Sequence, residues 1–155
     1  MQFARLFLLA LIPAAGLLAS DVALVRVWTG PRTADSFERI SEYFTGEENP
    51  GGQTVLRTQP TARAGYYWLV RTRTDATTEA RIELSVLTAG SPAPMVHALA
   101  TRLPRGSHVT LVGLTGDDWP DLDARPVAWK LRVLDANGRE LATEESFLWV
   151  TSNPT

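Results

Sequence analysis

Apolar and polar residues alternate most regularly near the C-terminal end of the chain. From 127 to 133 every second residue is large and apolar: Val127, Trp129, Leu131 and Val133. This period of two is typical of a strand with one buried face. Residues 135–138 (Asp-Ala-Asn-Gly) form a turn sequence, because Asn and Gly can take a positive φ, and a second apolar arm follows up to Trp149. The stretch 126–149 is therefore predicted to be the closing β-hairpin, with its tryptophans used for packing.

The same alternation predicts strands earlier in the chain. The strongest pattern, at 65–74, is apolar on both faces in its first half, so the N-terminal helix or the first strand is expected to cover its outer side. The stretch 95–102 alternates poorly and is expected at a sheet edge. Opposite charges such as Arg71 and Glu83 are expected to form weak cross-strand ion pairs. The remaining strands are predicted at 22–28, 54–58, 80–88 and 108–115.

One helix is predicted at 34–44. Phe37, Ile40 and Phe44 recur at helical spacing and would form one apolar face. Asp35 or Thr33 would cap the first turn. Three apolar residues at this spacing are typical of a helix that packs on a core, so we expect the helix to cover one end or one open face of the sheet. A partner-binding helix is the alternative.

Together these elements predict a mainly β protein, an antiparallel β-sandwich of about seven or eight strands with one short N-terminal helix packed on it. From Thr54 onward the layout resembles an immunoglobulin or fibronectin type III domain, at the level of the fold only. A small closed barrel is the alternative fold. The expected organisation is a leader at 1–20 followed by a single domain at 21–155.

The first 20 residues have the three-part layout of a secretory signal peptide. Arg5 precedes an apolar run at 6–19, and small residues at 19–20 offer a cleavage site. An uncleaved membrane anchor is the alternative, but the run falls short of the roughly 20 apolar residues that span a bilayer and contains Pro13 and Gly16. The protein is therefore expected to be exported, to the periplasm or outside the cell, without a transmembrane span after cleavage.

The composition narrows the class of protein further. The chain of 155 residues contains no cysteine, which excludes disulfide bonds, thiolate metal sites and a cysteine nucleophile. It also contains no acceptor sequence for N-glycosylation, and an exported protein with neither feature is most consistent with a bacterial source. The formal net charge of −2 argues against a dedicated nucleic-acid-binding protein.

Four carboxylates crowd the loop at 116–125: Asp117, Asp118, Asp121 and Asp123. Calcium prefers several oxygen ligands of this kind, but the spacing does not match an EF-hand loop. The alternative is an acidic turn whose aspartates hydrogen-bond to their own backbone. Calcium is the one cofactor that the sequence suggests, and only through this density of carboxylates.

Trp119 lies in the middle of the same loop, beside Pro120. An exposed ring at this position could stack on a sugar or on a partner side chain. Trp119 and the four aspartates would then form a binding site for a protein or polysaccharide of the cell envelope. The alternative is that the indole folds back and caps the open end of the sandwich, since large apolar residues are buried on average.

No sequence motif identifies a catalytic site. The two histidines are His97 and His108, and a triad of Ser107, His108 and Asp117 would require the fold to bring them together. Nucleophile elbows, phosphate-binding glycine loops and zinc motifs do not occur in the chain. We therefore predict a non-catalytic binding or interaction module of the bacterial envelope. The alternatives are an assembly accessory that acts by strand pairing, through an edge at 95–101, and a small hydrolase.

Overall fold

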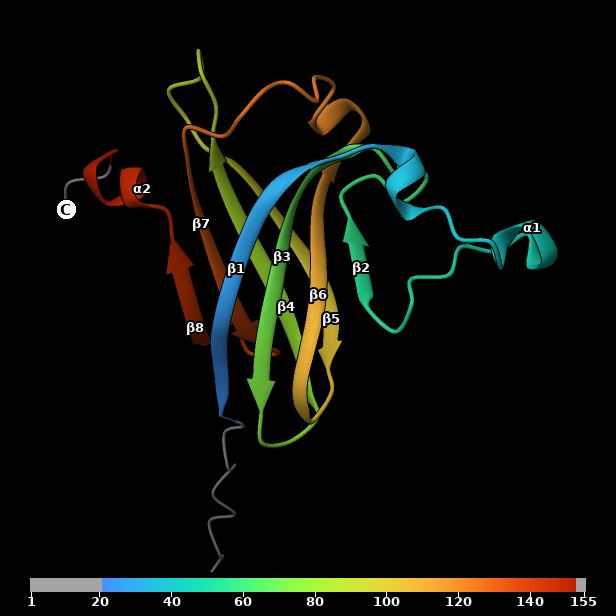
Figure 1. Ribbon diagram of the computed structural model, residues 1–155. Coiled ribbons are helices and arrows are strands. Elements are labelled where there is room, and N and C mark those ends of the chain that lie inside the picture. The colour runs from blue at the N-terminus through green and yellow to red at the C-terminus, as the bar shows by residue number, and fades with distance from the viewer. Residues whose placement is uncertain (1–20, 153–155) are drawn as a thin grey trace, which may run out of the picture.

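The computed structural model describes residues 21–152, so the predicted signal peptide lies outside the described residues. These residues form two four-stranded sheets (Figure 1). The first sheet contains, in spatial order, β1 (Val22–Arg32), β3 (Gly65–Thr74), β6 (Gly106–Thr115) and β2 (Thr54–Arg57). The second contains β5 (Met95–Leu103), β4 (Thr78–Leu87), β7 (Ala128–Asp135) and β8 (Glu140–Glu145). All neighbouring strands are antiparallel except β2 and β6, which are parallel.

Helical structure is confined to short elements: η1 (Ala34–Phe37), α1 (Glu42–Thr45), η2 (Gly116–Asp118) and α2 (Phe147–Ser152). Among residues 21–152, no helix has the length and apolar character needed to cross a membrane. The strands predicted at 65–74, 80–88, 95–102 and 108–115 are confirmed to within a few residues. β5 pairs with β4 alone, so its predicted place at an edge is confirmed as well.

The alternation of apolar residues decides which face of each strand is buried. In β4, Ile82, Leu84 and Val86 are at most 1% exposed, because they point toward the opposite sheet. The inner faces of both sheets contribute to one core around Trp68, which is 0% exposed. Tyr66 and Trp129 pack against its ring at centroid distances of 5.1 and 6.4 Å. The two sheets therefore face each other across a shared apolar layer.

The hairpin predicted at 126–149 is confirmed in its first arm and its turn. The turn closes through Asp135, whose Oδ1 accepts hydrogen bonds from the backbone nitrogens of Asn137 (2.8 Å) and Arg139 (2.9 Å). Gly138 takes a positive φ of 81°, whereas Asn137 does not. Glycine tolerates this conformation because it has no Cβ.

The second arm of that hairpin is shorter than predicted. β8 ends at Glu145, and Phe147 and Trp149 lie on α2. At Ser146 the backbone nitrogen still donates to the Trp129 carbonyl (2.8 Å), but the hydroxyl accepts the hydrogen bond from the Trp129 backbone nitrogen (2.9 Å). The Ser146 carbonyl accepts from the Trp149 backbone nitrogen (2.9 Å) instead, so the chain leaves the ladder and enters α2. Trp149 is still buried at 8% exposure, whereas Phe147 is 84% exposed.

The prediction of one continuous helix at 34–44 is wrong. η1 ends at Phe37, the next residue Glu38 is extended (φ −70°, ψ 133°), and α1 begins only at Glu42. Of the three residues expected on one apolar face, Phe37 is buried, but Ile40 and Phe44 are 79% and 85% exposed. Phe37 packs on Tyr67 and the chain then turns away from the sheet, so the helical spacing no longer places these residues on one face.

Phe37 nevertheless performs the covering role that the sequence predicts for this region. It lies on the outer face of the first sheet, with its ring centroid 4.9 Å from that of Tyr67. Tyr67 and Leu111 are thereby reduced to 1% and 3% exposure. The half of β3 that is apolar on both faces is therefore covered by η1, whereas β1 extends the sheet beside β3.

Candidate functional site

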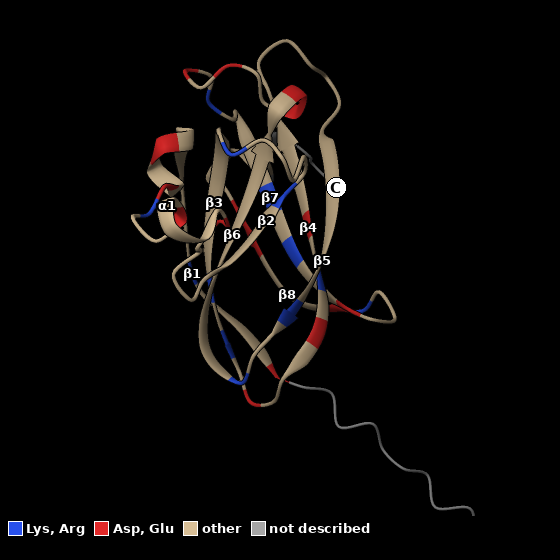
Figure 2. Cartoon of the chain, turned by 90° about the vertical axis from the view of Figure 1, so that its right-hand side faces the viewer, with Lys and Arg blue, Asp and Glu red and all other residues tan. Residues whose placement is uncertain are grey.

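The predicted acidic loop lies at one end of the two sheets, on η2 and the turn that follows (Figure 2). Trp119 is 4% exposed and belongs to the core cluster between the sheets. Its ring lies against Tyr66 at a centroid distance of 5.3 Å. The indole therefore does not offer a face for stacking, and its position matches the alternative in which the ring caps the open end of the fold.

The four aspartates of this loop lie on η2 (Asp117 and Asp118) and in the turn after it (Asp121 and Asp123). Asp121 Oδ1 accepts a hydrogen bond from the backbone nitrogen of Asp123 (2.8 Å), which is the local bonding expected of a turn. In the part of the chain that the structure describes, no group of three or more His, Asp or Glu side chains is placed to hold a metal ion. Calcium binding by Asp117, Asp118, Asp121 and Asp123 stays a prediction.

In the conceivable triad, Asp117 lies far from Ser107 and His108. His108 lies on β6, and its Nε2 is 2.9 Å from Thr54 Oγ1. Ser107 lies near the start of β6 and Asp117 lies just beyond its end, roughly 30 Å apart at the usual rise per strand residue. His97 belongs to β5 of the other sheet. This triad is therefore not assembled.

A different surface stands out between η1 and β2. Residues 38–53, here called the protrusion, extend beyond the β2 edge of the first sheet, with α1 at their outer end (Figure 1). The protrusion carries Ile40, Tyr43 and Phe44, which are 79%, 83% and 85% exposed. Three large apolar side chains exposed within five residues of one another along the chain are typical of an interaction surface.

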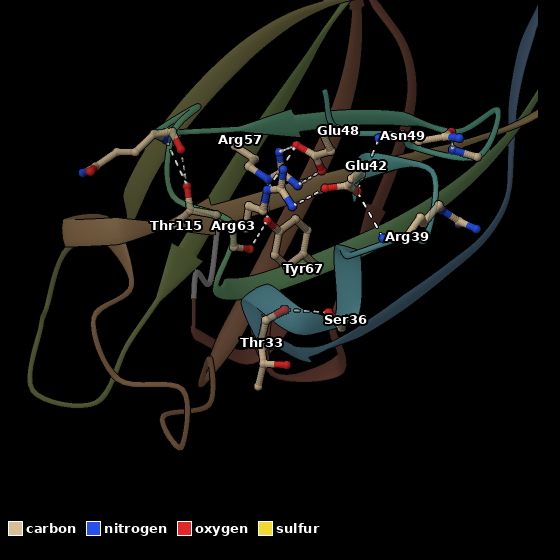
Figure 3. Close-up of polar contacts among 12 residues, drawn as sticks. Thr33, Ser36, Arg39, Glu42, Glu48, Asn49, Arg57, Arg63, Tyr67 and Thr115 are labelled. Atoms are coloured by element: carbon tan, nitrogen blue, oxygen red, sulfur yellow. Dashed lines mark hydrogen bonds and ion pairs between the residues drawn. The ribbon is translucent and has the colours of Figure 1, made fainter. Parts of the chain in front are cut away.

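Two arginines from the body of the protein hold the protrusion in place (Figure 3). Arg57 on β2 donates from its two terminal nitrogens to the carboxylate of Glu48, at 2.8 and 2.6 Å. Arg63, in the connection before β3, donates to Glu42 Oε2 at 2.9 Å, and its Nε lies 3.6 Å from Glu48 Oε2. Glu42 and Glu48 belong to different parts of the protrusion, so these ion pairs clamp it at two points.

Arg57 is itself held in place by Tyr67 of β3 and Phe37 of η1. Its Nε donates to the Tyr67 hydroxyl (2.9 Å), which in turn donates to the backbone carbonyl of Arg63 (2.6 Å). The guanidinium lies over the ring of Phe37, 4.8 Å from the centroid, and the Arg57 side chain is only 7% exposed. A planar guanidinium that binds a carboxylate at two points and stacks on a ring has little freedom left. Arg57 therefore acts as a rigid brace.

Short-range hydrogen bonds close the protrusion on itself. Glu42 Oε1 accepts from the backbone nitrogens of Arg39 (3.3 Å) and Asn49 (3.4 Å), and Asn49 Nδ2 donates to Ser41 Oγ (3.0 Å). Gly46 ends α1 with a positive φ of 72°. The glycine-rich loop that follows α1 is therefore tied back to that helix at Asn49.

The two arginines lower the pKa values of the carboxyl groups that they bind. For Glu48 the main cause is the hydrogen-bonded pair with Arg57, and for Glu42 it is the pair with Arg63. Burial has the opposite effect on both groups, but the hydrogen bonds outweigh it. Burial raises the pKa of Tyr67, so its hydroxyl stays protonated and can donate to the Arg63 carbonyl.

We expect the brace to weaken in acid. Because the folded-state pKa values of Glu42 and Glu48 lie below the ordinary value of 4.5, their stabilising effect is fully present above about pH 4.5 and is lost as the pH falls through the folded values. The melting temperature should therefore fall more steeply between pH 5 and pH 3 in the wild type than in a Glu42→Gln/Glu48→Gln variant. Equal acid sensitivity of the two proteins would contradict this account.

The sequence shows this surface only indirectly. Glu47, Glu48 and the glycines after them are typical of a solvated loop, and Arg57 is one of many arginines. Only the folded chain shows which of these charges meet and that Ile40 and Phe44 point into solvent. Comparison with models of protein families, with curated proteins and with solved structures gave no match.

Proposed function

We propose that the protein is an exported, non-catalytic interaction module of the bacterial envelope, built as an immunoglobulin-like β-sandwich, and that the protrusion is its protein-binding surface. Export is inferred from the signal-peptide pattern of residues 1–20. The order of the strands supports the fold assignment, because the chain crosses between sheets after β3, β5 and β6, as Greek-key connections of that fold do.

The binding role is supported above all by the exposure of Ile40, Tyr43 and Phe44 on a braced segment. Each of these side chains is about four-fifths exposed, although the core of the first sheet lies only a few residues away at Phe37. The ion pairs of Arg57 and Arg63 hold the segment off the sheet. A surface that is held in its binding conformation loses less entropy when it binds a partner.

The charges around these residues define the chemistry of the partner. Asp35, Glu38 and Glu47 are exposed and form no ion pair with any residue from 21 to 152, and Arg39 is the basic residue of the protrusion. A protein surface with an apolar pocket bordered by Lys or Arg would complement this pattern. The same carboxylates would repel the anionic headgroups of a membrane surface.

Site-specific photo-crosslinking tests the proposal in intact cells. A benzophenone amino acid in place of Tyr43 should give a discrete adduct, and the crosslinked peptide should carry apolar residues beside Lys or Arg. The same probe at Phe147, which is 84% exposed on α2, is the control and should give none. Absence of an adduct at Tyr43, or equal adducts at both positions, would contradict the proposal.

The alternative function, assembly by strand pairing, would use the edge of β5. β5 pairs with β4 only, and its residue Val96 is 56% exposed, so a partner strand could extend the second sheet there. The same probe at Val96 distinguishes the two functions. An adduct at Val96 without one at Tyr43 would favour strand pairing over binding by the protrusion.

A further inference from the structure

Another surface, rich in arginine, lies on the outer face of β1 and β3. It consists of Arg26, Trp28, Arg71 and Arg73, here called the arginine strip. The cross-strand ion pair expected between Arg71 and Glu83 is absent, because β3 and β4 belong to different sheets and Glu83 pairs with Arg132 at 2.9 Å. No arginine of the strip forms an ion pair with a residue that the structure describes.

Two of these arginines converge on one half-exposed ring. Arg26 and Arg71 lie directly opposite each other in the β1–β3 ladder. Their Cζ atoms are 4.9 and 5.8 Å from the ring centroid of Trp28, which is 41% exposed. Like charges that face each other across a ladder destabilise a sheet. The indole offsets part of this repulsion through cation–π contacts, but the guanidinium N–H groups keep their capacity to bind an anion.

The strip continues along the sheet in both directions. Arg73 follows Arg71 on the same face of β3, about 7 Å further along the strand. On the other side of Trp28, a shallow depression of about 370 Å³ leads to Arg32 and Ser36. Arg32 also lacks a carboxylate partner within residues 21–152. The result is a narrow row of guanidinium groups on a protein whose net charge is −2.

We propose that the arginine strip binds a linear polysaccharide that carries carboxylate groups. The planar guanidinium matches a carboxylate at two points, and a row of such groups matches charges repeated along one extended polymer. A membrane would require a broad contact plane, whereas the strip is confined to two neighbouring strands. Single-stranded nucleic acid would require free aromatic faces for base stacking. The ring of Trp28 is already in contact with the guanidinium groups of Arg26 and Arg71.

The part of the strip around Arg26 and Arg71 is separate from the proposed protein-binding surface, whereas Arg32 lines a small depression that also borders the protrusion. β1 and β2 are opposite edges of the first sheet, and the protrusion lies beyond β2. Failure of polysaccharide binding would therefore leave the crosslinking result at Tyr43 unaffected, and the reverse also holds.

Binding of the full chain to polygalacturonate, measured at low and high salt, tests the proposal. Dextran serves as the neutral polysaccharide, and oligothymidylate and phosphatidylglycerol vesicles serve as the other anionic probes. We expect salt-sensitive binding to polygalacturonate that weakens by about tenfold or more in an Arg26→Gln/Arg71→Gln variant. An Arg81→Gln/Arg102→Gln variant makes the same change of charge on the second sheet and should bind as the wild type does.

A measurement of stability separates a binding defect from a folding defect. The Arg26→Gln/Arg71→Gln variant should melt at the wild-type temperature or slightly above it, because the substitutions remove a like-charge pair. The proposal would be overturned if polygalacturonate does not bind, or if the Arg81→Gln/Arg102→Gln control loses as much affinity. Tighter binding of oligothymidylate or of the vesicles would also overturn it, by assigning the strip to nucleic acid or to a membrane.

Discussion

Replacing Trp119 with alanine is expected to lower the free energy of unfolding by about 3–5 kcal/mol. The indole is 4% exposed and packs against Tyr66 in the core between the sheets, so its removal leaves a cavity where the acidic loop is anchored. Urea unfolding followed by circular dichroism measures the change. Trp28→Ala is the matched control, because that ring is 41% exposed and its loss should cost about 1 kcal/mol.

The same substitution also tests the role that the sequence suggests for this loop. If Trp119→Ala leaves stability unchanged but abolishes binding of a polysaccharide or protein, Trp119 and the four neighbouring aspartates would form the binding site after all. The burial of the ring leads us to expect the opposite result, a large loss of stability.

Replacing Arg57 with methionine is expected to lower the free energy of unfolding by about 2–3 kcal/mol. Glu48 would lose both hydrogen bonds to the guanidinium, and the Tyr67 hydroxyl would lose a donor. The loss should stay below the range for a fully buried pair, because the Glu48 side chain is 25% exposed and water can reach it.

Two further variants show whether the pair itself causes that loss. Adding Glu48→Gln to Arg57→Met should restore part of the stability, because it removes the carboxylate left without a partner. Arg102→Met breaks an ion pair with Glu79 in which both side chains are 71% exposed, and it should cost at most a few tenths of a kcal/mol. Equal losses for Arg57→Met and Arg102→Met would mean that the brace contributes little.

The strands could be predicted because a period of two directly marks a strand with one buried face. In β4, every second residue from Ile82 to Val86 faces the core, as the pattern indicates. No comparable local pattern in the sequence indicates which strands pair with each other. Nothing near Thr54 indicates that β2 runs parallel to β6, a partner that lies more than fifty residues further along the chain.

The two local errors have the same physical origin. Spacing alone favours one helix through Phe37, Ile40 and Phe44, but the contact of Phe37 with Tyr67 determines where the chain leaves the sheet. Apolar residues at 147 and 149 suggest a longer second arm, but the Ser146 hydroxyl accepts the hydrogen bond from the Trp129 backbone nitrogen and the strand ends. In both cases a tertiary contact overrides a periodic pattern.

The candidate site was harder to predict than the fold. A dense group of carboxylates and a tryptophan attract attention to residues 117–123, but the folded chain buries the tryptophan. The protrusion depends on pairs such as Arg63 with Glu42, which are 21 residues apart and carry no motif. Exposure of Ile40 and Phe44 becomes visible only once the helix is known to be interrupted.

If the braced protrusion is the protein-binding surface, the yield of photo-crosslinking at Tyr43 should depend on Arg57. We expect a discrete adduct in the otherwise wild-type protein and a yield several-fold lower in the Arg57→Met background, at a temperature where both proteins are folded. Equal yields in the two backgrounds, or no adduct in either, would contradict this role of the protrusion.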